Sequence, residues 1–256
     1  MVRSFSFALV FLLSSLDSNA QERSPVLVEL FTSEGCSSCP PADAALEHLA
    51  RLQPVRGVEI IPLSFHVDYW NQLGWADPYS SPNFSARQEN YSQVFGGDRI
   101  YTPQMVVDGS SEFLGDESLA IKAVATASKQ PKAGMKMTLS PRCERLSSVK
   151  LTVPQLSTSS AGAATELFIA VTESGLVSKV ARGENAGRTL RHTAVVRQLR
   201  SLGEVNRGPK SSVTSTQVSL DKGWKPAAIQ VVAFLQEKRS RRVLGATAQP
   251  LCEAGP

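Results

Sequence analysis

The chain has 256 residues, of which 42% are hydrophobic and 20% are charged, so it is not an intrinsically disordered chain and has enough apolar side chains for a core. Its net charge of +4 combines two unlike halves, because residues 1–134 carry 9 Lys and Arg against 15 Asp and Glu, and residues 135–256 carry 18 against 8. This asymmetry predicts two domains and argues against a dedicated nucleic-acid-binding protein, whose basic residues should line one face.

The N-terminus has the layout of a secretory signal peptide. Arg3 supplies a positive charge, residues 5–16 are apolar except for serines, and residues 18–20 offer a cleavage site with small residues. The apolar run is too short to span a bilayer, which needs about 20 residues. We therefore predict a signal peptide over residues 1–20 and a mature protein that is periplasmic or extracellular, without stable membrane insertion. The alternative is an uncleaved anchor or a buried N-terminal helix.

Strands and helices alternate over the next hundred residues. β-rich apolar runs predict strands, and apolar residues at helical spacing predict helices. The predicted strands cover residues 26–31, 58–65, 104–107 and 112–114, and the predicted helices cover 40–53, 82–95 and 119–127. The resulting order β-α-β-α-β-β-α over residues 21–129 predicts an α/β domain with a central sheet and crossover helices.

Residues 135–256 have a different pattern, and we expect residues 130–134 to be a linker. Short strand-like runs separated by turn-forming clusters predict a mostly-β, sandwich-like domain. These runs cover residues 136–139, 147–153, 166–171, 192–200, 216–220, 228–236 and 243–247. A helix over residues 192–202 is the alternative for the fourth run. A dense polar run over residues 184–192 fits three interpretations: a latch that pairs its basic residues with the acidic first domain, an anion-binding surface or a solvated loop.

The cysteine pattern separates one candidate redox pair from one structural bridge. Thiols of exported proteins tend to pair, and four cysteines allow three connectivities. We predict a local Cys36–Cys39 disulfide and a long-range Cys143–Cys252 disulfide, which would be structural.

Cys36 and Cys39 form a C-x-x-C motif between a predicted strand and a predicted helix. At a helix N-terminus, free N–H groups and the helix dipole stabilise a thiolate, which is the attacking species in disulfide exchange. An inert local disulfide and a metal site are the alternatives. Because no second pair of Cys or His ligands follows at zinc-site spacing, we expect neither a metal nor a cofactor.

A second motif, Thr102 followed by Pro103, lies directly before the third predicted strand. Taken with the C-x-x-C motif and the β-α-β-α-β-β-α order, it resembles the thioredoxin superfamily. The resemblance implies thiol–disulfide exchange, with Cys36 as nucleophile and Cys39 as resolving thiol. It also implies a cis-proline at Pro103 and substrate docking on the backbone of Thr102.

The chain also resembles a narrower group of exported, thioredoxin-like bacterial proteins of unassigned function. The resemblance covers nearly all of the mature chain. The matching stretches are residues 29–43 (ELFTSEGCSSCPPAD), 65–81, 87–91 and 101–109, and 183–197 (GENAGRTLRHTAVVR) in the second half.

Further candidates surround these motifs. By the same resemblance, Glu29 could be a buried proton acceptor for the resolving thiol, although we expect Glu29 at the surface because Glu is rarely fully buried. His66 could lower the pKa of a cysteine or could be a packed structural histidine. Tyr69 and Trp70, in an aromatic loop over residues 66–79, are candidate contacts for a peptide. Arg87 and Gln88 are assigned to packing and salt bridging.

These observations favour an exported thiol–disulfide oxidoreductase whose partners are the thiols or disulfides of exported proteins and peptides. The first alternative is a non-enzymatic binding module in which the Cys36–Cys39 disulfide is structural and the aromatic loop holds a ligand or partner. A third interpretation is soft-metal handling by the two cysteines and His66.

Overall fold

The computed structural model describes residues 23–97, 99–156, 164–205 and 210–253, so the predicted signal peptide lies outside the described residues. No helix in this described part is long and apolar enough to cross a membrane.

The elements, in chain order, are β1 (Ser24–Thr32), α1 (Pro40–Leu52), β2 (Val58–His66), η1 (Asn71–Leu73), α2 (Pro82–Phe95), β3 (Gln104–Val107), β4 (Ser111–Phe113), α3 (Glu117–Ala127), β5 (Lys136–Ser140), β6 (Leu146–Val153), β7 (Thr165–Glu173), β8 (Leu176–Lys179), β9 (Thr189–His192), β10 (Val195–Val205), β11 (Ser212–Ser219), η2 (Pro226–Ala228), β12 (Ile229–Glu237) and β13 (Val243–Pro250).

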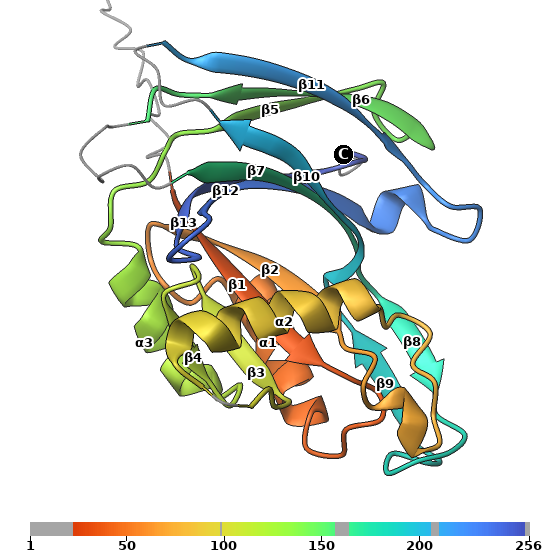
Figure 1. Cartoon of the computed structure of the whole chain (residues 1–256). Helices are drawn as coiled ribbons and strands as arrows, with labels where there is room; N and C mark the ends of the chain where they lie inside the picture. Colours follow the sequence, from red (N-terminus) through yellow and green to blue (C-terminus); the bar gives the residue numbers. More distant parts are fainter. Residues whose placement is uncertain (1–22, 98, 157–163, 206–209, 254–256) are drawn as a thin grey trace, which may run out of the picture.

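One eight-stranded sheet runs through both halves of the chain. Its strand order is β13-β12-β7-β10-β2-β1-β3-β4. The halves meet where β10 pairs in parallel with β2, at Val195 opposite Ser64, and the N–H of Ser64 donates to the carbonyl of Ala194 at 2.8 Å. The sheet therefore continues across the boundary that the charge asymmetry suggested at residues 130–134 (Figure 1).

Helices cover both faces of the first half of this sheet. Even-numbered residues of β1 such as Val28 and Leu30 pack against α1 and α3, whereas odd-numbered ones such as Leu27 and Phe31 pack against α2. This alternation follows from the two-residue repeat of a strand, which sends successive side chains to opposite faces. Consequently, the parity of a residue in β1 or β2 decides which helix it meets.

The sheet curls around α2. The apolar cluster beneath α2 includes residues of β1 and β2 and also Val232 and Phe234 of β12. At the far end of the curl, the N–H of Val243 in β13 donates to the carbonyl of Asp108 after β3, at 2.8 Å. A Cβ atom on Gly109 in this turn would lie only 1.9 Å from the carbonyl oxygen of Arg241. Two turns that are distant in strand order are therefore in direct contact, and only glycine fits there.

A second layer packs on the other face of β7 and β12. The three-stranded sheet β11-β6-β5 contributes Leu139, Val149 and Leu151 to an apolar cluster that includes Leu167 and Val231 of the large sheet. The single strand predicted over residues 192–200 is instead divided, because Ala194, with φ 53°, separates β9 from β10. As a result, β8 and β9 form a separate hairpin (Figure 1), and β9 contacts α1, the helix that follows the cysteines.

A long-range disulfide fastens the end of the chain. Cys143, between β5 and β6, is bonded to Cys252 after β13, and the N–H of Cys143 donates to the carbonyl of Leu251 at 2.9 Å. The two cysteines are separated by 109 positions. In the chain-entropy model, a loop of this length stabilises the fold by about 4–5 kcal/mol.

A buried ion pair occupies the centre of the molecule. Arg87 of α2 donates from Nε to Glu29 of β1 at 2.6 Å, and the hydroxyl of Tyr91 donates to the other Glu29 oxygen at 2.5 Å. Glu29 is completely inaccessible to solvent, so the surface position expected for it is wrong. The guanidinium lies over four aromatic rings, at 5.3–5.6 Å from the centroids of Phe65, Tyr91, Phe168 and Phe234. Gln236 of β12 completes the network by donating to the hydroxyl of Tyr91 at 2.8 Å.

We expect Arg87→Met to destabilise the fold strongly, because it leaves the Glu29 carboxylate buried without its counter-charge. Breaking one side of a buried ion pair typically costs about 3–5 kcal/mol. Urea unfolding monitored by circular dichroism measures the loss. The double variant Glu29→Gln with Arg87→Met removes both charges and should lose less stability than Arg87→Met alone. Equal losses in the two variants would contradict this account.

Candidate functional site

The Cys36–Cys39 disulfide lies in the turn that joins β1 to α1. The N–H of Cys36 donates to the carbonyl of Ser33 at 3.1 Å, and the N–H of Cys39 donates to the carbonyl of Cys36 at 3.3 Å. Helix α1 then begins with two prolines, which suit the first helical turn because its N–H groups have no intrahelical partner. Both cysteines are fully buried, whereas the two serines between them are exposed. The loop therefore presents its serines to solvent and its sulfur atoms to the protein interior.

The Thr102–Pro103 pair is packed beside the first turn of α1. The peptide bond between the two residues is cis, and Pro103 is buried directly before β3. Gly115 lies between Pro103 and α1: a Cβ atom at Gly115 would lie 2.5 Å from the Cβ of Ala42 and 3.6 Å from that of Pro103. Close packing at this glycine thus places Pro103 next to the helix that follows the cysteines.

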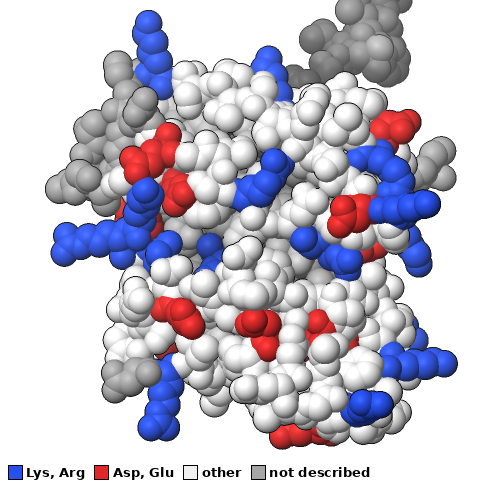
Figure 2. Space-filling model, turned by 45° about the vertical axis from the view of Figure 1, so that its right-hand side comes forward, with Lys and Arg blue, Asp and Glu red and all other residues white. Residues whose placement is uncertain are grey.

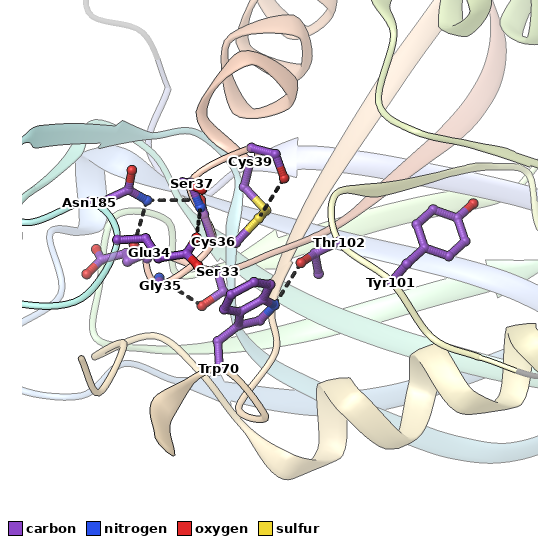
Figure 3. Close-up of a disulfide and its surroundings, with 12 residues drawn as sticks. Ser33, Glu34, Gly35, Cys36, Ser37, Cys39, Trp70, Tyr101, Thr102 and Asn185 are labelled. Carbon is purple, nitrogen blue, oxygen red and sulfur yellow. Dashed lines mark hydrogen bonds between the residues drawn. A yellow bond between two sulfur atoms is a disulfide. The ribbon is translucent and has the colours of Figure 1, made fainter. Parts of the chain in front are cut away.

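Trp70 connects the cysteine loop to Thr102. Its indole Nε1 donates to the hydroxyl of Thr102 at 2.8 Å, and its Cβ would lie 3.2 Å from a Cβ placed on Gly35. Figure 3 shows the indole ring between the Cys36 loop and Thr102. The hydroxyl of Tyr69 donates to Gln88 of α2 at 3.1 Å and also interacts with the side chains of Thr102 and Trp70, and burial raises the pKa of Tyr69 to about 12. Of the two predicted aromatic contacts, Trp70 lies against the cysteine loop and Tyr69 lies behind it, against Trp70 and Thr102.

The loop between β8 and β9 clamps the cysteine turn from the second half of the chain. The side-chain amide of Asn185 donates to the carbonyls of Glu34 and Cys36, both at 2.9 Å (Figure 3). The side chain of Ser37, together with its N–H at 3.1 Å, donates to the Glu184 carboxylate, and these hydrogen bonds lower the pKa of Glu184. Asn185 is itself fully buried. Residues 184–192 do hold the two halves together, as the latch interpretation expected, but these contacts are made by Asn185 and Glu184 and not by basic residues.

A buried polar network lies behind the clamp. Both carboxylate oxygens of Glu34 are occupied, one by His192 Nε2 at 3.0 Å and the other by the indole N–H of Trp75 at 2.7 Å. Asp77 accepts hydrogen bonds from the N–H of Glu34 at 2.8 Å and from His66 Nδ1 at 2.7 Å. The network therefore joins the residue two positions before Cys36 to the aromatic loop and to β9.

The network shifts the pKa values of its members. Burial acts to lower the pKa of His66, but the negative charges of Asp77, Asp43 and Glu34 outweigh it and raise that pKa. Burial acts to raise the pKa of Asp77, but His66 outweighs it and holds that pKa below its usual value. For Asp43, in the first turns of α1, desolvation prevails over His66 and His192 and raises the pKa.

Comparison of the sequence with models of protein families identifies the family of the chain. Residues 27–236 match the model of a family described as "Protein of unknown function (DUF1223)". The chain belongs to this family. A comparison with curated proteins gave no match.

Two solved structures are similar to the chain over most of its length. Protein AGR_C_4864 from Agrobacterium tumefaciens is 24% identical with a TM-score of 0.68, over 93% of this chain and 99% of that one. HBP35 of Porphyromonas gingivalis is 18% identical with a TM-score of 0.68, over 91% of this chain and 77% of that one. At these identities, the similarity establishes a shared fold only.

In this DUF1223 member, five of the predicted site residues lie together around the disulfide, whereas Glu29 and His66 do not contact the cysteines. Cys36, Cys39, Trp70, Thr102 and Pro103 lie together. Glu29 does not join them, because it points to the α2 face of β1 while the helix that follows the cysteines packs on the opposite face. His66 lies on the cysteine side, but its hydrogen-bond partner is Asp77 and not a cysteine.

Other residues of the site were less visible in the sequence. Glu34 and Asp77 lie within the matching stretches 29–43 and 65–81, but no motif of residue types points to either of them. Asn185 and His192 lay in the polar run already noted, but their partners are more than 140 positions away. Over the described ranges, no three His, Cys, Asp or Glu side chains form a group that could hold a metal ion.

We expect Asn185→Ala to loosen the cysteine turn, because the buried carbonyl of Glu34 loses its hydrogen-bond donor and that of Cys36 keeps only the N–H of Cys39 at 3.3 Å. An unsatisfied buried group costs about 1–3 kcal/mol, so reduction of the Cys36–Cys39 disulfide by dithiothreitol should be about tenfold faster. Alkylation of the released thiols followed by mass spectrometry measures the rate. Arg191→Ala, an exposed change on the adjacent β9, is the control. Equal rates in Asn185→Ala and the unmodified chain would contradict the clamp.

Proposed function

We propose that the chain is an exported thiol–disulfide oxidoreductase that acts on protein disulfides through Cys36 and Cys39. The observation that supports this most directly is the Cys36–Cys39 disulfide at the start of α1, with the Thr102–Pro103 pair packed beside that helix. The β-α-β-α-β-β-α order of β1 to α3 supports a thioredoxin-like assignment for residues 21–129. Export is supported by the N-terminal sequence pattern.

The chemistry needs only the two cysteines. In the reduced protein, the Cys36 thiolate attacks a substrate disulfide, which forms a mixed disulfide and releases one substrate thiol. Cys39 then attacks Cys36, which restores the 36–39 disulfide and releases the second thiol, so the substrate gains two electrons. The reverse sequence oxidises a substrate dithiol. The hydroxyl of Ser38 lies 3.4 Å from the Cys36 sulfur and can donate to a thiolate there, in addition to the N-terminal N–H groups of the helix.

Exchange requires the buried sulfur of Cys36 to become accessible. Trp70 stands between the cysteine loop and Thr102, and its hydrogen bond to Thr102 closes that side of the site. We propose that a substrate strand displaces this indole and docks on the backbone of Thr102. The side chain that closes the resting site would then control access to it.

The second candidate function is a binding module in which the Cys36–Cys39 bridge is structural. Complete burial of both cysteines and the clamp by Asn185 favour this candidate, because inert disulfides are typically inaccessible. The partner would bind at the aromatic loop over residues 66–79. The two functions differ in what happens to the bond when a dithiol substrate is added.

We expect Cys36→Ser to abolish exchange with a disulfide-bonded protein substrate, because the attacking thiolate is removed. Cys39→Ser should instead accumulate a mixed disulfide at Cys36, because no second thiol resolves it. Non-reducing electrophoresis and mass spectrometry detect the trapped species. The double variant Cys143→Ser with Cys252→Ser is the matched control, since it removes a disulfide and leaves the 36–39 pair. Exchange that survives in Cys36→Ser would overturn the enzymatic proposal in favour of the binding module.

We expect Trp70→Ala to speed alkylation of the reduced Cys36 thiol by iodoacetamide, because the covering ring is gone. Loss of one side-chain hydrogen bond of about 1 kcal/mol corresponds to a rate increase of roughly fivefold. Trp75→Phe is the comparison, since it changes a second indole that bonds to Glu34 and not to Thr102. If Trp70→Ala and the unmodified chain react equally fast, the indole does not control access.

A further inference from the structure

A pocket of about 400 Å³ opens between the start of α2 and the β10 strand, away from the cysteine loop. Its walls come from the aromatic loop and first turn of α2, from β10, and from the turn before η2. The residues that define its chemistry are Tyr79, Asn83, Arg197, Arg200, Asp221 and Trp224. Figure 2 turns this side of the molecule forward and shows basic side chains in a row across the middle of the face. The volume is within the usual range of ligand sites.

Arg197 is the central group of this pocket. Its guanidinium is held between two aromatic rings, 5.1 Å from the centroid of Tyr79 and 5.0 Å from that of Trp224. This stacking fixes the guanidinium plane and leaves its edges free, because cation–π contacts use the face of the group. The side chain is 20% exposed, so most of it is already removed from water.

The N–H groups of Arg197 have no hydrogen-bond acceptor among the residues that the structure describes. Arg197 forms an ion pair with the buried Glu173, but the Glu173 oxygen lies 3.7 Å from Nη1, which is beyond hydrogen-bond distance. Glu173 is already bound through its other oxygen by the N–H of Lys225 at 3.0 Å. A largely buried cation with free donors at the wall of a pocket is therefore prepared for an acceptor that comes from outside the chain.

The remaining charges of the pocket favour an anion with a single negative charge. Arg200 and the positive end of the α2 dipole add to Arg197, whereas Asp221 and the nearby Glu173 offset part of this charge. A planar group with two acceptor oxygens matches the edge of a fixed guanidinium. Both properties describe a carboxylate better than a doubly charged phosphate.

We propose that the Arg197 pocket binds the carboxylate of a small organic acid or of a peptide C-terminus. Arg197 would hold the two oxygens through its free N–H groups, and the rings of Tyr79 and Trp224 would keep the guanidinium in place. The site is separate from Cys36 and Cys39 and does not depend on their redox activity.

The test is a titration of the full mature chain with four probes. N-acetylglycine supplies a small carboxylate, N-acetylglycinamide is its neutral match, acetyl-Ala-Ala-Gly supplies a peptide C-terminus, and inorganic phosphate supplies the competing anion. Calorimetry and the ¹H–¹⁵N signal of Arg197 Nε report binding up to about 10 mM, the weak end of the useful affinity range. We expect both carboxylates to bind and to shift that signal, and the amide to do neither. Tighter binding of the peptide would assign the site to a C-terminus, and equal binding would assign it to small acids.

Matched variants connect the binding to Arg197. Arg197→Gln should weaken carboxylate binding by at least about tenfold, because it removes the charge and the paired donors. Arg191→Gln, on the neighbouring β9 and outside the pocket, should bind as the unmodified chain does. If Arg197→Gln does not fold, the Arg200→Gln variant, which changes the second arginine of the pocket, should still weaken carboxylate binding. The comparison of the acid with the amide then shows whether the carboxylate charge is recognised. No binding by either carboxylate, equal binding of the amide, stronger binding of phosphate, or unchanged binding by folded Arg197→Gln would each overturn the proposal.

Discussion

The buried ion pair between Glu29 and Arg87 is the interaction on which the arrangement of the other elements depends. Arg87 reaches Glu29 of β1 at 2.6 Å and also lies over Phe168 of β7 and Phe234 of β12, so one side chain of α2 contacts strands from both halves. A charge buried this deeply is tolerated only with its counter-ion and hydrogen bonds in place. The sheet therefore curls around α2 at a position set by one guanidinium, and the pairing of β10 with β2 in this sheet brings the β8–β9 hairpin to the cysteines.

The cysteine site is consequently a product of the whole chain. β1 and α1 supply the disulfide, the segment before β3 supplies Thr102 and Pro103, and the β8–β9 loop supplies the amide that fixes the turn. The second half of the chain thus contributes directly to the cysteine site, through Asn185. It occupies the backbone carbonyl of Glu34, which a disulfide loop held by local contacts alone would leave to water, and it gives the carbonyl of Cys36 a second donor.

The sequence predicted the local features of this structure well and the long-range ones poorly. The positions of Cys36, Cys39 and Pro103 follow from short motifs and from the alternation of strands and helices. The face occupied by Glu29 does not, because its partner Arg87 is 58 positions away and a glutamate in an apolar strand looks unfavourable until that partner is known. The same holds for Asn185, whose bond to Cys36 joins a side chain to a backbone carbonyl and leaves no pattern of residue types. The continuity of the sheet was also hidden, because β10 and β2 share only one paired position, Val195 with Ser64.

The distance in sequence between the cysteine turn and its clamp has a consequence for biosynthesis. Asn185 follows Cys36 by 149 positions, and at a synthesis rate of about 5–20 residues per second the nascent chain carries its two thiols for roughly 7–30 s before the clamp exists. During that interval Cys36 and Cys39 belong to an incomplete domain that any oxidant or thiol in the surroundings can reach. The two thiols are therefore made well before the residue that holds their turn in the finished fold.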